Sequence, residues 1–495
     1  MRGYSGLEVI FRRIAAVDEA ARLLHWDMSV MMPPGGAAAR SEQLAALKVI
    51  AHEQMTAPVV RDLLDAAEAD PPADPWAAAN LREMRRQWRH AVAVDGALVE
   101  ALSKACATCE MVWRAARPES DFAAIAPSLA EVLRLVREQA AAKAVALGTS
   151  RYEALLDQYE PHGSTRHIDA LFDDLAGFLP GFLEKVLARQ EAAPAPMELE
   201  GPFPTEAQRP LAVTLMQRLG FDFDHGRLDV SLHPFCSGVP DDVRITTRYD
   251  EADFLQALMG VLHETGHALY ERGLPAAWRL QPVGEARGMA MHESQSLLVE
   301  MQACRSREFV TFAAPLMRDA FAVDGAAWSE ENLYRHYIRV ERGFIRVDAD
   351  EVTYPAHIIL RYRLERAMIE GLLEVPDLPA AWNEGMEELL GLRVPDDRHG
   401  CLQDIHWYDG AFGYFPTYTL GALTAAQLFA AANRADGDIR PGIARGDFAP
   451  LLGWLRENVH GLGSMLPADT LIAGATGKPL GTDAFKAHLQ ARYLG

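Results

Sequence analysis

The sequence predicts a mainly α-helical protein of two lobes with a small antiparallel β-sheet. Apolar residues recur at intervals of three and four through the first half of the chain, with charged residues between them, as in packed amphipathic helices. A segment with four prolines, 192–204, interrupts this pattern and is typical of a link between lobes. Only residues 227–249 alternate as strands do. We therefore expect an N-terminal helical lobe over 1–205 and a second lobe over 206–495.

The N-terminal lobe is expected to consist of five helices, separated by Pro- and Gly-rich breaks at 31–36 and 70–72 and followed by another at 161–164. The five predicted helices are Gly6–Met28, Ala37–Glu53, Pro58–Ala69, Pro75–Ala116 and Asp121–Leu147. Cys106 and Cys109 form a C-x-x-C pair inside the fourth helix, which favours buried packing over redox or metal chemistry because no second pair exists.

Composition limits the partners and the compartment. A chain of 495 residues, 49% of them hydrophobic, can bury one large core or two. Its formal net charge of −21 repels phosphate backbones and anionic lipids, so we expect neither nucleic acid nor membrane as a partner. The first residues have no secretion-signal pattern, and no long apolar run occurs elsewhere. With five scattered cysteines, this composition predicts a cytoplasmic protein.

Two short segments open the second lobe as strands. Arg227–Leu232 and Val243–Tyr249 are alternating and β-branched, and the turn sequence SGVPDD lies between them. We expect them to pair in an antiparallel sheet beside the helix predicted over Asp250–Gly273. An edge strand there can pair with an extended peptide, although a sheet that only packs fits the sequence equally well. Helices are expected from this point to the end of the chain.

The helix over Asp250–Gly273 carries the sequence His263-Glu264-Thr265-Gly266-His267. Side chains four apart lie on one helix face, so both imidazoles can bind one metal ion. Glu264 points off that face but stays near enough to take a proton from water activated by the metal. The pattern also arises by chance, but Gly260 and Gly266 beside the histidines indicate a close approach of another group. We interpret the motif as a zinc hydrolase site.

A catalytic zinc ion takes three protein ligands and keeps one position open. Three candidates for the third ligand lie within Gly288–Glu308, namely His292, Glu293 and Glu300. Neighbouring helical residues diverge by about 100°, so His292 and Glu293 do not both face one ion. We favour Glu293 and expect Glu300, two turns further along, at the surface.

Six short motifs follow one another in the second lobe. They are His233-Pro234-Phe235, the D-x-R-x-T of Asp242–Thr246, the HExxH helix, His292-Glu293-Ser294-Gln295, Ile345–Asp350 and Gly400–Trp407. With these motifs the chain resembles the carboxypeptidase Taq family of thermostable metallocarboxypeptidases over nearly its whole length. The resemblance implies a deep groove in a fold of the neurolysin and angiotensin-converting-enzyme type, and one peptidase unit made of both lobes. It also implies Glu293 as third ligand, Zn²⁺ with Co²⁺ able to replace it, peptide substrates and a homodimer.

Catalytic roles follow as expectations. Glu264 would serve as general base and acid. The segment after His406 is rich in tyrosines, and its similarity to related helical zincins implies His406 and Tyr418 as partners of the oxyanion, although aromatic residues in such a segment commonly only pack.

Removal of a C-terminal residue requires a cation for the terminal carboxylate, and the guanidinium group suits it best. Arg244 and Arg346 lie in the family's motifs, but each can instead be a structural ion-pair partner, Arg346 with Asp348 or Asp350. His233 is expected to order the cleft beside the strand, and Asp242 and Asp350 to orient ligands or arginines.

Three positions depart from the family's pattern, namely Leu297, Met301 and Tyr408, and they leave side-chain preference open. The sequence thus favours a zinc carboxypeptidase of broad specificity. There are two alternatives. One is an oligoendopeptidase with the same metal ligands, and the other is a metal-stabilised scaffold without catalysis.

Overall fold

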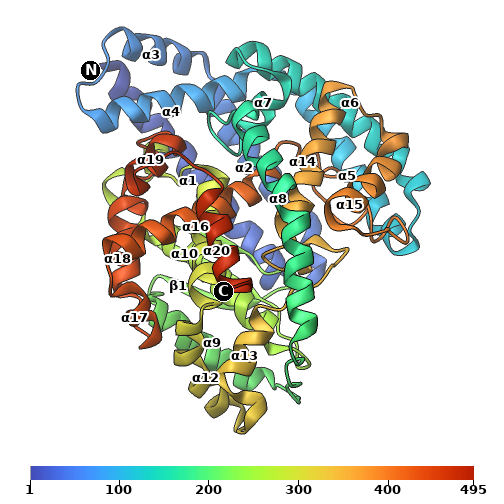
Figure 1. The fold of residues 1–495 in the computed structure, drawn as a ribbon. Helices are drawn as coiled ribbons and strands as arrows, with labels where there is room; N and C mark the ends of the chain where they lie inside the picture. Colours follow the sequence, from blue (N-terminus) through green and yellow to red (C-terminus); the bar gives the residue numbers. More distant parts are fainter. Residues whose placement is uncertain (1) are drawn as a thin grey trace.

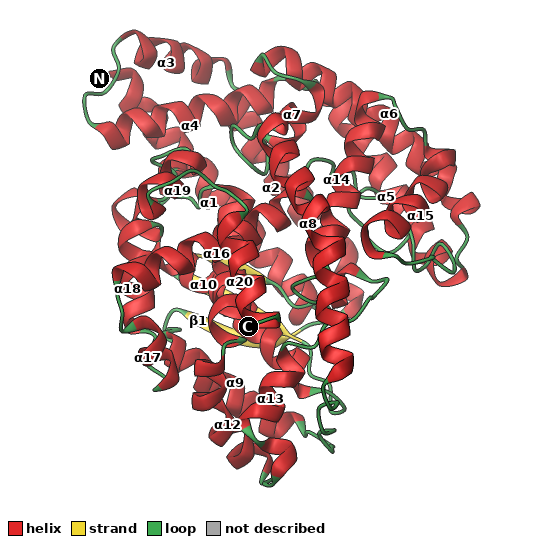
Figure 2. Cartoon of the chain, in the orientation of Figure 1, coloured by secondary structure: helices red, strands yellow, loops and turns green. Residues whose placement is uncertain are grey.

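The computed structural model describes residues 2–495 and confirms a mainly helical protein (Figures 1 and 2). The helices before the sheet, with one short 3₁₀ turn (η1, Pro34–Gly36), are α1 (Arg2–Val30), α2 (Ala37–Thr56), α3 (Pro58–Ala69), α4 (Pro75–Val92), α5 (Gly96–Glu119), α6 (Phe122–Leu147), α7 (Arg151–Leu156), α8 (Thr165–Ala192) and α9 (Thr205–Leu219).

The remaining helices follow the sheet. They are α10 (Phe254–Gly273), α11 (Gly288–Leu297), the π-helical segment η4 (Leu298–Cys304), α12 (Arg307–Phe321), α13 (Glu330–Tyr337), α14 (Tyr354–Glu370), α15 (Leu378–Leu390), α16 (Pro416–Ala435), α17 (Ile439–Ala444), α18 (Ala449–Asn458), α19 (Ala468–Thr476) and α20 (Asp483–Tyr493). Short 3₁₀ turns link them: η2 (Ala276–Trp278), η3 (Pro282–Gly284), η5 (Ala326–Trp328), η6 (Arg346–Asp348), η7 (Val375–Asp377) and η8 (His460–Leu462).

One predicted helix is wrong in its extent. The pattern over 75–116 is divided into α4 and α5, with a break after Val92. Asp95 causes the break, because its side chain accepts a hydrogen bond from the backbone N of Leu98 at 2.9 Å and so caps a new helix. An Asp-Gly pair inside an apolar pattern was the available signal.

The sheet is mixed, so the expected antiparallel pairing of the two predicted strands is wrong. The strands β1 (Gly226–Val230) and β3 (Asp242–Thr247) run parallel. Part of the expected turn forms a third strand, β2 (Cys236–Val239), which pairs antiparallel with the other edge of β3. Gly238 permits the tight return because its φ is +99° and a Cβ there would lie 2.1 Å from the carbonyl oxygen of Asp242. The edges of the sheet are therefore β1 and β2.

Helix α10 packs against β3 and against α11, and α16 also packs against α11. Helices α10 and α16 lie near the middle of the view in Figure 1. One large apolar core extends through these elements from α5 to α20. A second, smaller core joins helices α1 to α4, of which α3 and α4 lie at the upper left of Figure 1. The central position of α10 and α11 is what holds the predicted metal ligands in a rigid environment.

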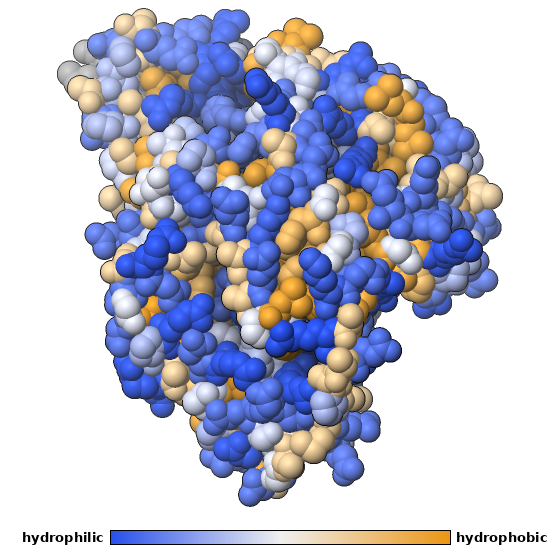
Figure 3. All heavy atoms as spheres, viewed as in Figure 1, coloured by the Kyte–Doolittle hydropathy of each residue, from blue (hydrophilic) through white to orange (hydrophobic). Residues whose placement is uncertain are grey.

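The predicted lobe boundary between residues 205 and 206 falls in the first turn of α9, directly after the non-helical segment 193–204. Across that boundary, α14 and α15 pack against α8, and α14 also contacts α6 and α7 (Figure 1). The face drawn in Figure 3 is mostly hydrophilic, with apolar side chains in smaller separate areas. Within residues 2–495 no helix combines the length and the apolar character needed to span a bilayer.

Candidate active site

His263, His267 and Glu293 come together, as the sequence predicts. One ligand atom from each lies within 4.8 Å of the other two. The Nε2 atoms of His263 and His267 lie 3.9 and 3.5 Å from Oε2 of Glu293. Two ligands at tetrahedral positions around zinc are about 3.4 Å apart. Two imidazole nitrogens and one carboxylate oxygen at this spacing fit a catalytic zinc ion. With Glu264 these residues are called the metal half of the site.

Glycine contacts bring the ligands together. At Gly266 of α10, a Cβ would lie 2.5 Å from the carbonyl oxygen of Gln295, so the backbones of α10 and α11 touch there. At Gly421 of α16, a Cβ would lie 2.8 Å from the side chain of Glu293. The close approach expected at Gly266 is confirmed. Gly260 has nothing within 4 Å of its Cβ position, so the same expectation is wrong there.

Glu300 is not at the surface, contrary to the sequence prediction. It is 8% exposed, and its Oε2 lies 2.9 Å from Nδ1 of His263. Its other oxygen accepts a hydrogen bond from Arg305 at 2.7 Å. Glu300 lies seven positions after Glu293, about two helical turns, and this same-face spacing indicates a place near the ligands. Glu300 belongs to the π-helical segment η4, which places its carboxylate beside His263.

His292 is not a ligand candidate in this geometry, because its ring lies behind that of His267. The Nδ1 atoms of His267 and His292 are 2.6 Å apart. His292 Nε2 in turn lies 2.8 Å from Oε1 of Glu271. Burial, together with the neighbouring His292 and His263, lowers the pKa of His267 well below its ordinary value. A neutral imidazole is the form that binds a metal.

Glu264 follows directly after the first ligand and is 8% exposed. Burial raises its pKa to about 7; Glu293 acts in the same direction and His263 opposes it. A carboxylate in that range can both accept and return a proton near neutral pH. Its position and its pKa therefore suit the general base and acid role.

A second group of residues, called here the arginine half, faces the metal half from η6, α16 and the segment between α15 and α16. Arg346 is the charged member, and its Nε and Nη2 each lie 2.8 Å from Oδ1 of Asp404. Burial acts to lower the pKa of Arg346, but Asp404 outweighs it and the pKa lies above the ordinary value. The alternative of a structural ion pair holds for Arg346, but its partner is Asp404 and not Asp348 or Asp350; Asp350 accepts hydrogen bonds from backbone N–H groups.

His406 and Tyr418 are the other predicted members, and Nε2 of His406 lies 3.1 Å from the Tyr418 hydroxyl. The Tyr418 ring also lies 5.0 Å from Cζ of Arg346. Burial lowers the pKa of His406 to about 4 and raises that of Tyr418 to about 12, so both are neutral at pH 7. The charge of Glu293 raises the pKa of Tyr354, Tyr414 and Tyr418 in addition to burial. The two unpredicted tyrosines, Tyr354 and Tyr414, therefore lie near the metal half.

Arg244 lies in a different environment. It alternates with Val243 and Ile245, which are buried in the core, so its side chain is on the other face of the sheet. Asp242 binds its guanidinium at 3.0 and 2.7 Å, and the Trp26 ring of α1 lies 4.2 Å from its Cζ. Asp242 thus orients an arginine, as expected.

His233 is exposed in the loop between β1 and β2. Its backbone carbonyl accepts a hydrogen bond from Ser231 Oγ at 2.5 Å. Among the described residues, neither Arg244 nor the His233 side chain has a recorded contact with a metal-half residue.

The remaining positions singled out in the sequence are packing residues. Tyr408 is buried and donates its hydroxyl hydrogen to the carbonyl of Cys401 at 2.8 Å, away from the site. Leu297 is buried in the core. Burial raises the thiol pKa of Cys106 to about 11 and of Cys109 to about 12, which agrees with packing inside α5.

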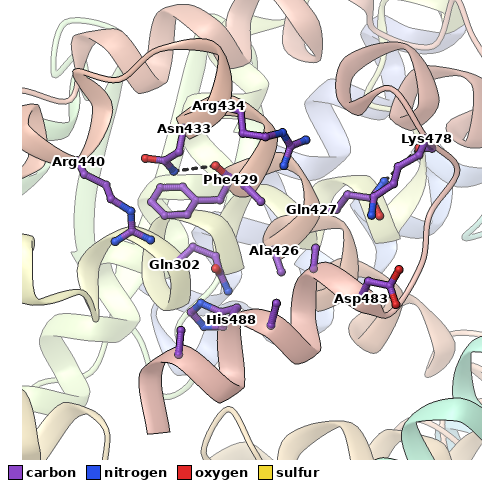
Figure 4. A pocket seen from close by; sticks show the side chains of 14 residues that line it. Gln302, Ala426, Gln427, Phe429, Asn433, Arg434, Arg440, Lys478, Asp483 and His488 are labelled. Carbon is purple, nitrogen blue, oxygen red and sulfur yellow. Dashed lines mark hydrogen bonds between the residues drawn. The ribbon is translucent and has the colours of Figure 1, made fainter. Parts of the chain in front are cut away.

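A cavity of about 390 Å³ lies at another place, between α16 and α20 (Figure 4). Gln302, Arg434 and His488 are among its lining residues, and the metal ligands, Glu264 and Arg346 are not. This cavity is therefore separate from the candidate site.

Comparisons with known proteins agree with this geometry. The family model of carboxypeptidase Taq (M32) metallopeptidase matches residues 6–493. Thermostable carboxypeptidase 1 of Thermus thermophilus is 40% identical over 501 residues, covering 99% of this chain and 98% of that protein. The structure of Trypanosoma cruzi metallocarboxypeptidase 1 matches with a TM-score of 0.98 at 40% identity, over 100% of both chains. The M32 carboxypeptidase of Deinococcus radiodurans R1 matches with a TM-score of 0.95 at 35% identity, over 100% and 99%.

Proposed function

The chain belongs to the carboxypeptidase Taq (M32) family of metallocarboxypeptidases, and on this premise we propose that it is a zinc-dependent enzyme of broad specificity that removes single C-terminal residues from peptides. The observation that supports the metal best is the convergence of His263, His267 and Glu293 within 4.8 Å. Cobalt, which also accepts imidazole and carboxylate ligands, would replace zinc. When bound, the ion supplies a Lewis acid that polarises the scissile carbonyl and makes water more acidic.

Glu264 takes a proton from the attacking water and then gives it to the leaving amine. Its pKa of about 7 suits both transfers, and burial is the main cause of that value. This step contributes about 10² to 10⁴ in rate, the usual range for general acid and base catalysis.

Tyr418 is proposed as the donor to the oxyanion. Its oxygen lies 3.1 Å from Nε2 of His406. If the neutral His406 carries its proton on Nε2, it donates to that oxygen, and the phenol hydrogen of Tyr418 is free to point at the substrate. His406 is then a positioning residue for Tyr418.

Arg346 is proposed to bind the terminal carboxylate. Asp404 holds Nε and Nη2, while Nη1 has no recorded hydrogen bond among the described residues. Arg361 is less suited to this role, because it is fully buried and each of its three nitrogens already donates a hydrogen bond, to Asp404, the His357 carbonyl and Gln403. Arg244 and His233 are kept as proposed contacts with a more distant part of the peptide. Cytoplasmic location and a homodimer are further proposals, from composition and from the family resemblance respectively.

The test is release of the C-terminal residue from a pair of peptides that differ only in having a free or an amidated terminus. We expect activity on the free peptide, loss of that activity with chelator and recovery with Zn²⁺ or Co²⁺. The amidated peptide should be cut much more slowly because it lacks the charge that Arg346 binds. Equal cleavage of both peptides would contradict the carboxypeptidase proposal.

A further inference from the structure

Behind His267 lies a chain of two hydrogen bonds that ends in a carboxylate. The Nδ1 atoms of His267 and His292 are 2.6 Å apart, and His292 Nε2 lies 2.8 Å from Oε1 of Glu271. The exposed fractions of these side chains are 13%, 17% and 20%, so water competes little for the bonds. The rings of His267 and His292 are also 4.6 Å apart. The chain starts and ends on α10 and passes through α11.

The direction of donation in this chain follows from its carboxylate end. An ionised carboxylate only accepts hydrogen bonds, so Nε2 of His292 must donate to Glu271. When Nε2 of His267 holds a metal ion, the proton of His267 is on Nδ1, so Nδ1 of His267 donates to Nδ1 of His292. His267 is left with its lone pair on Nε2, the atom that lies 3.5 Å from Oε2 of Glu293.

We propose that His292 and Glu271 are positioning residues that fix the proton of His267 on Nδ1 and so present its Nε2 to the metal. This inference rests on the proposed metal role of His267. His292 is suited to the task because it must accept on one ring nitrogen and donate on the other.

His263, the other proposed histidine ligand, is held by a carboxylate directly, without a second histidine between them. Nδ1 of His263 lies 2.9 Å from the carboxylate of Glu300 directly. Glu300 is itself paired with Arg305 at 2.7 Å. The two ligands are therefore oriented by different groups, and a change at His292 should affect His267 without removing the partner of His263.

The experiment measures Zn²⁺ affinity of the metal-free full-length protein by competition with a chromophoric chelator. His292→Leu removes the acceptor for His267, and we expect it to weaken Zn²⁺ binding about 10- to 100-fold. His292→Gln retains an accepting oxygen and a donating NH₂ group, so we expect it to recover most of that loss. Glu384→Gln is the matched control, because Glu384 is an exposed carboxylate on α15 and should leave the affinity within about threefold.

A second measurement reads the proton position itself. Ring ¹⁵N NMR of the metal-free protein, with His267→Gln and His292→Gln used for assignment, should show Nδ1–H at His267 and Nε2–H at His292. Glu271→Leu removes the fixed acceptor, and both forms of His292 should then appear. Thermal unfolding of each metal-free variant shows whether a loss of Zn²⁺ affinity comes from a misoriented His267 ring or from a weakened link between α10 and α11.

The outcomes are distinct. Wild-type affinity in His292→Leu, or Nε2–H at His267 in the wild-type protein, would overturn the inference. Equal losses of affinity and stability in His292→Leu and His292→Gln would also overturn it, since a helix-to-helix link alone explains that result. If the wild-type protein itself does not bind Zn²⁺, the proposed function fails first.

Discussion

The metal half and the arginine half of the site are assembled in different ways. In the metal half, three of four residues lie within five positions of one helix, and Gly266 lets the second helix touch the first. In the arginine half, Arg346 depends on Asp404, which lies 58 residues further along the chain. Most of the metal half is therefore encoded locally, whereas the placement of the arginine proposed to bind the carboxylate depends on packing between distant segments.

The strongest test of the metal half is Glu264→Gln. We expect kcat to fall by about 10² to 10⁴ because the amide cannot accept the proton of the attacking water. Zn²⁺ affinity should change little, since Glu264 is not a ligand. Steady-state kinetics and chelator competition give the two numbers. A variant that keeps its activity would show that the base lies elsewhere.

Gly266→Ala tests whether the metal half depends on the close contact between α10 and α11. The added methyl would lie 2.5 Å from the Gln295 carbonyl, so α10 and α11 must separate. We expect a loss of about 1–3 kcal/mol in the free energy of unfolding, as for overpacked cores, together with weaker Zn²⁺ binding.

Gly260→Ala is the control on the same helix, where a Cβ meets nothing within 4 Å. It should raise stability by about 1 kcal/mol through helix propensity. Chemical denaturation of both variants provides the comparison, and similar effects in the two would refute the close-contact argument.

Arg346→Gln tests the arginine half. We expect kcat/KM on peptides with a free terminus to fall about 10- to 100-fold, the worth of one charged hydrogen-bonded contact. The slow cleavage of amidated peptides should not fall further. The measurement is the ratio of the two kcat/KM values, and a parallel fall in both would point to lost structure around Asp404.

Arg244→Gln should have the smallest effect, less than about threefold in kcat/KM on dipeptide-length substrates. The reason is its place across the sheet, where Asp242 and Trp26 hold its guanidinium group. Kinetics on substrates of increasing length would show whether its contribution grows with distance from the cut bond. An effect equal to that of Arg346→Gln would remove the distinction between the two arginines.

Most helices were predictable because their periodicity and caps are local. Pro58–Ala69 was predicted to the residue, and the end of α6 at Leu147 was also correct. The break at Asp95 and the third strand at Cys236–Val239 were missed, because a polar residue in an apolar pattern and a Gly-containing turn can each belong to more than one structure.

From the sequence alone, His263, Glu264 and His267 follow as one site, because a helix places residues four apart on one face whatever surrounds it, and the family motif adds Glu293. The sequence also determined the family, through motifs that keep their order along the chain. Only the tertiary structure decided the partners: Glu300 behind His263, the His292 and Glu271 chain behind His267, and Asp404 on Arg346. These contacts join residues that are 21 to 58 positions apart, where packing between elements, and no local periodicity, sets which side chains meet.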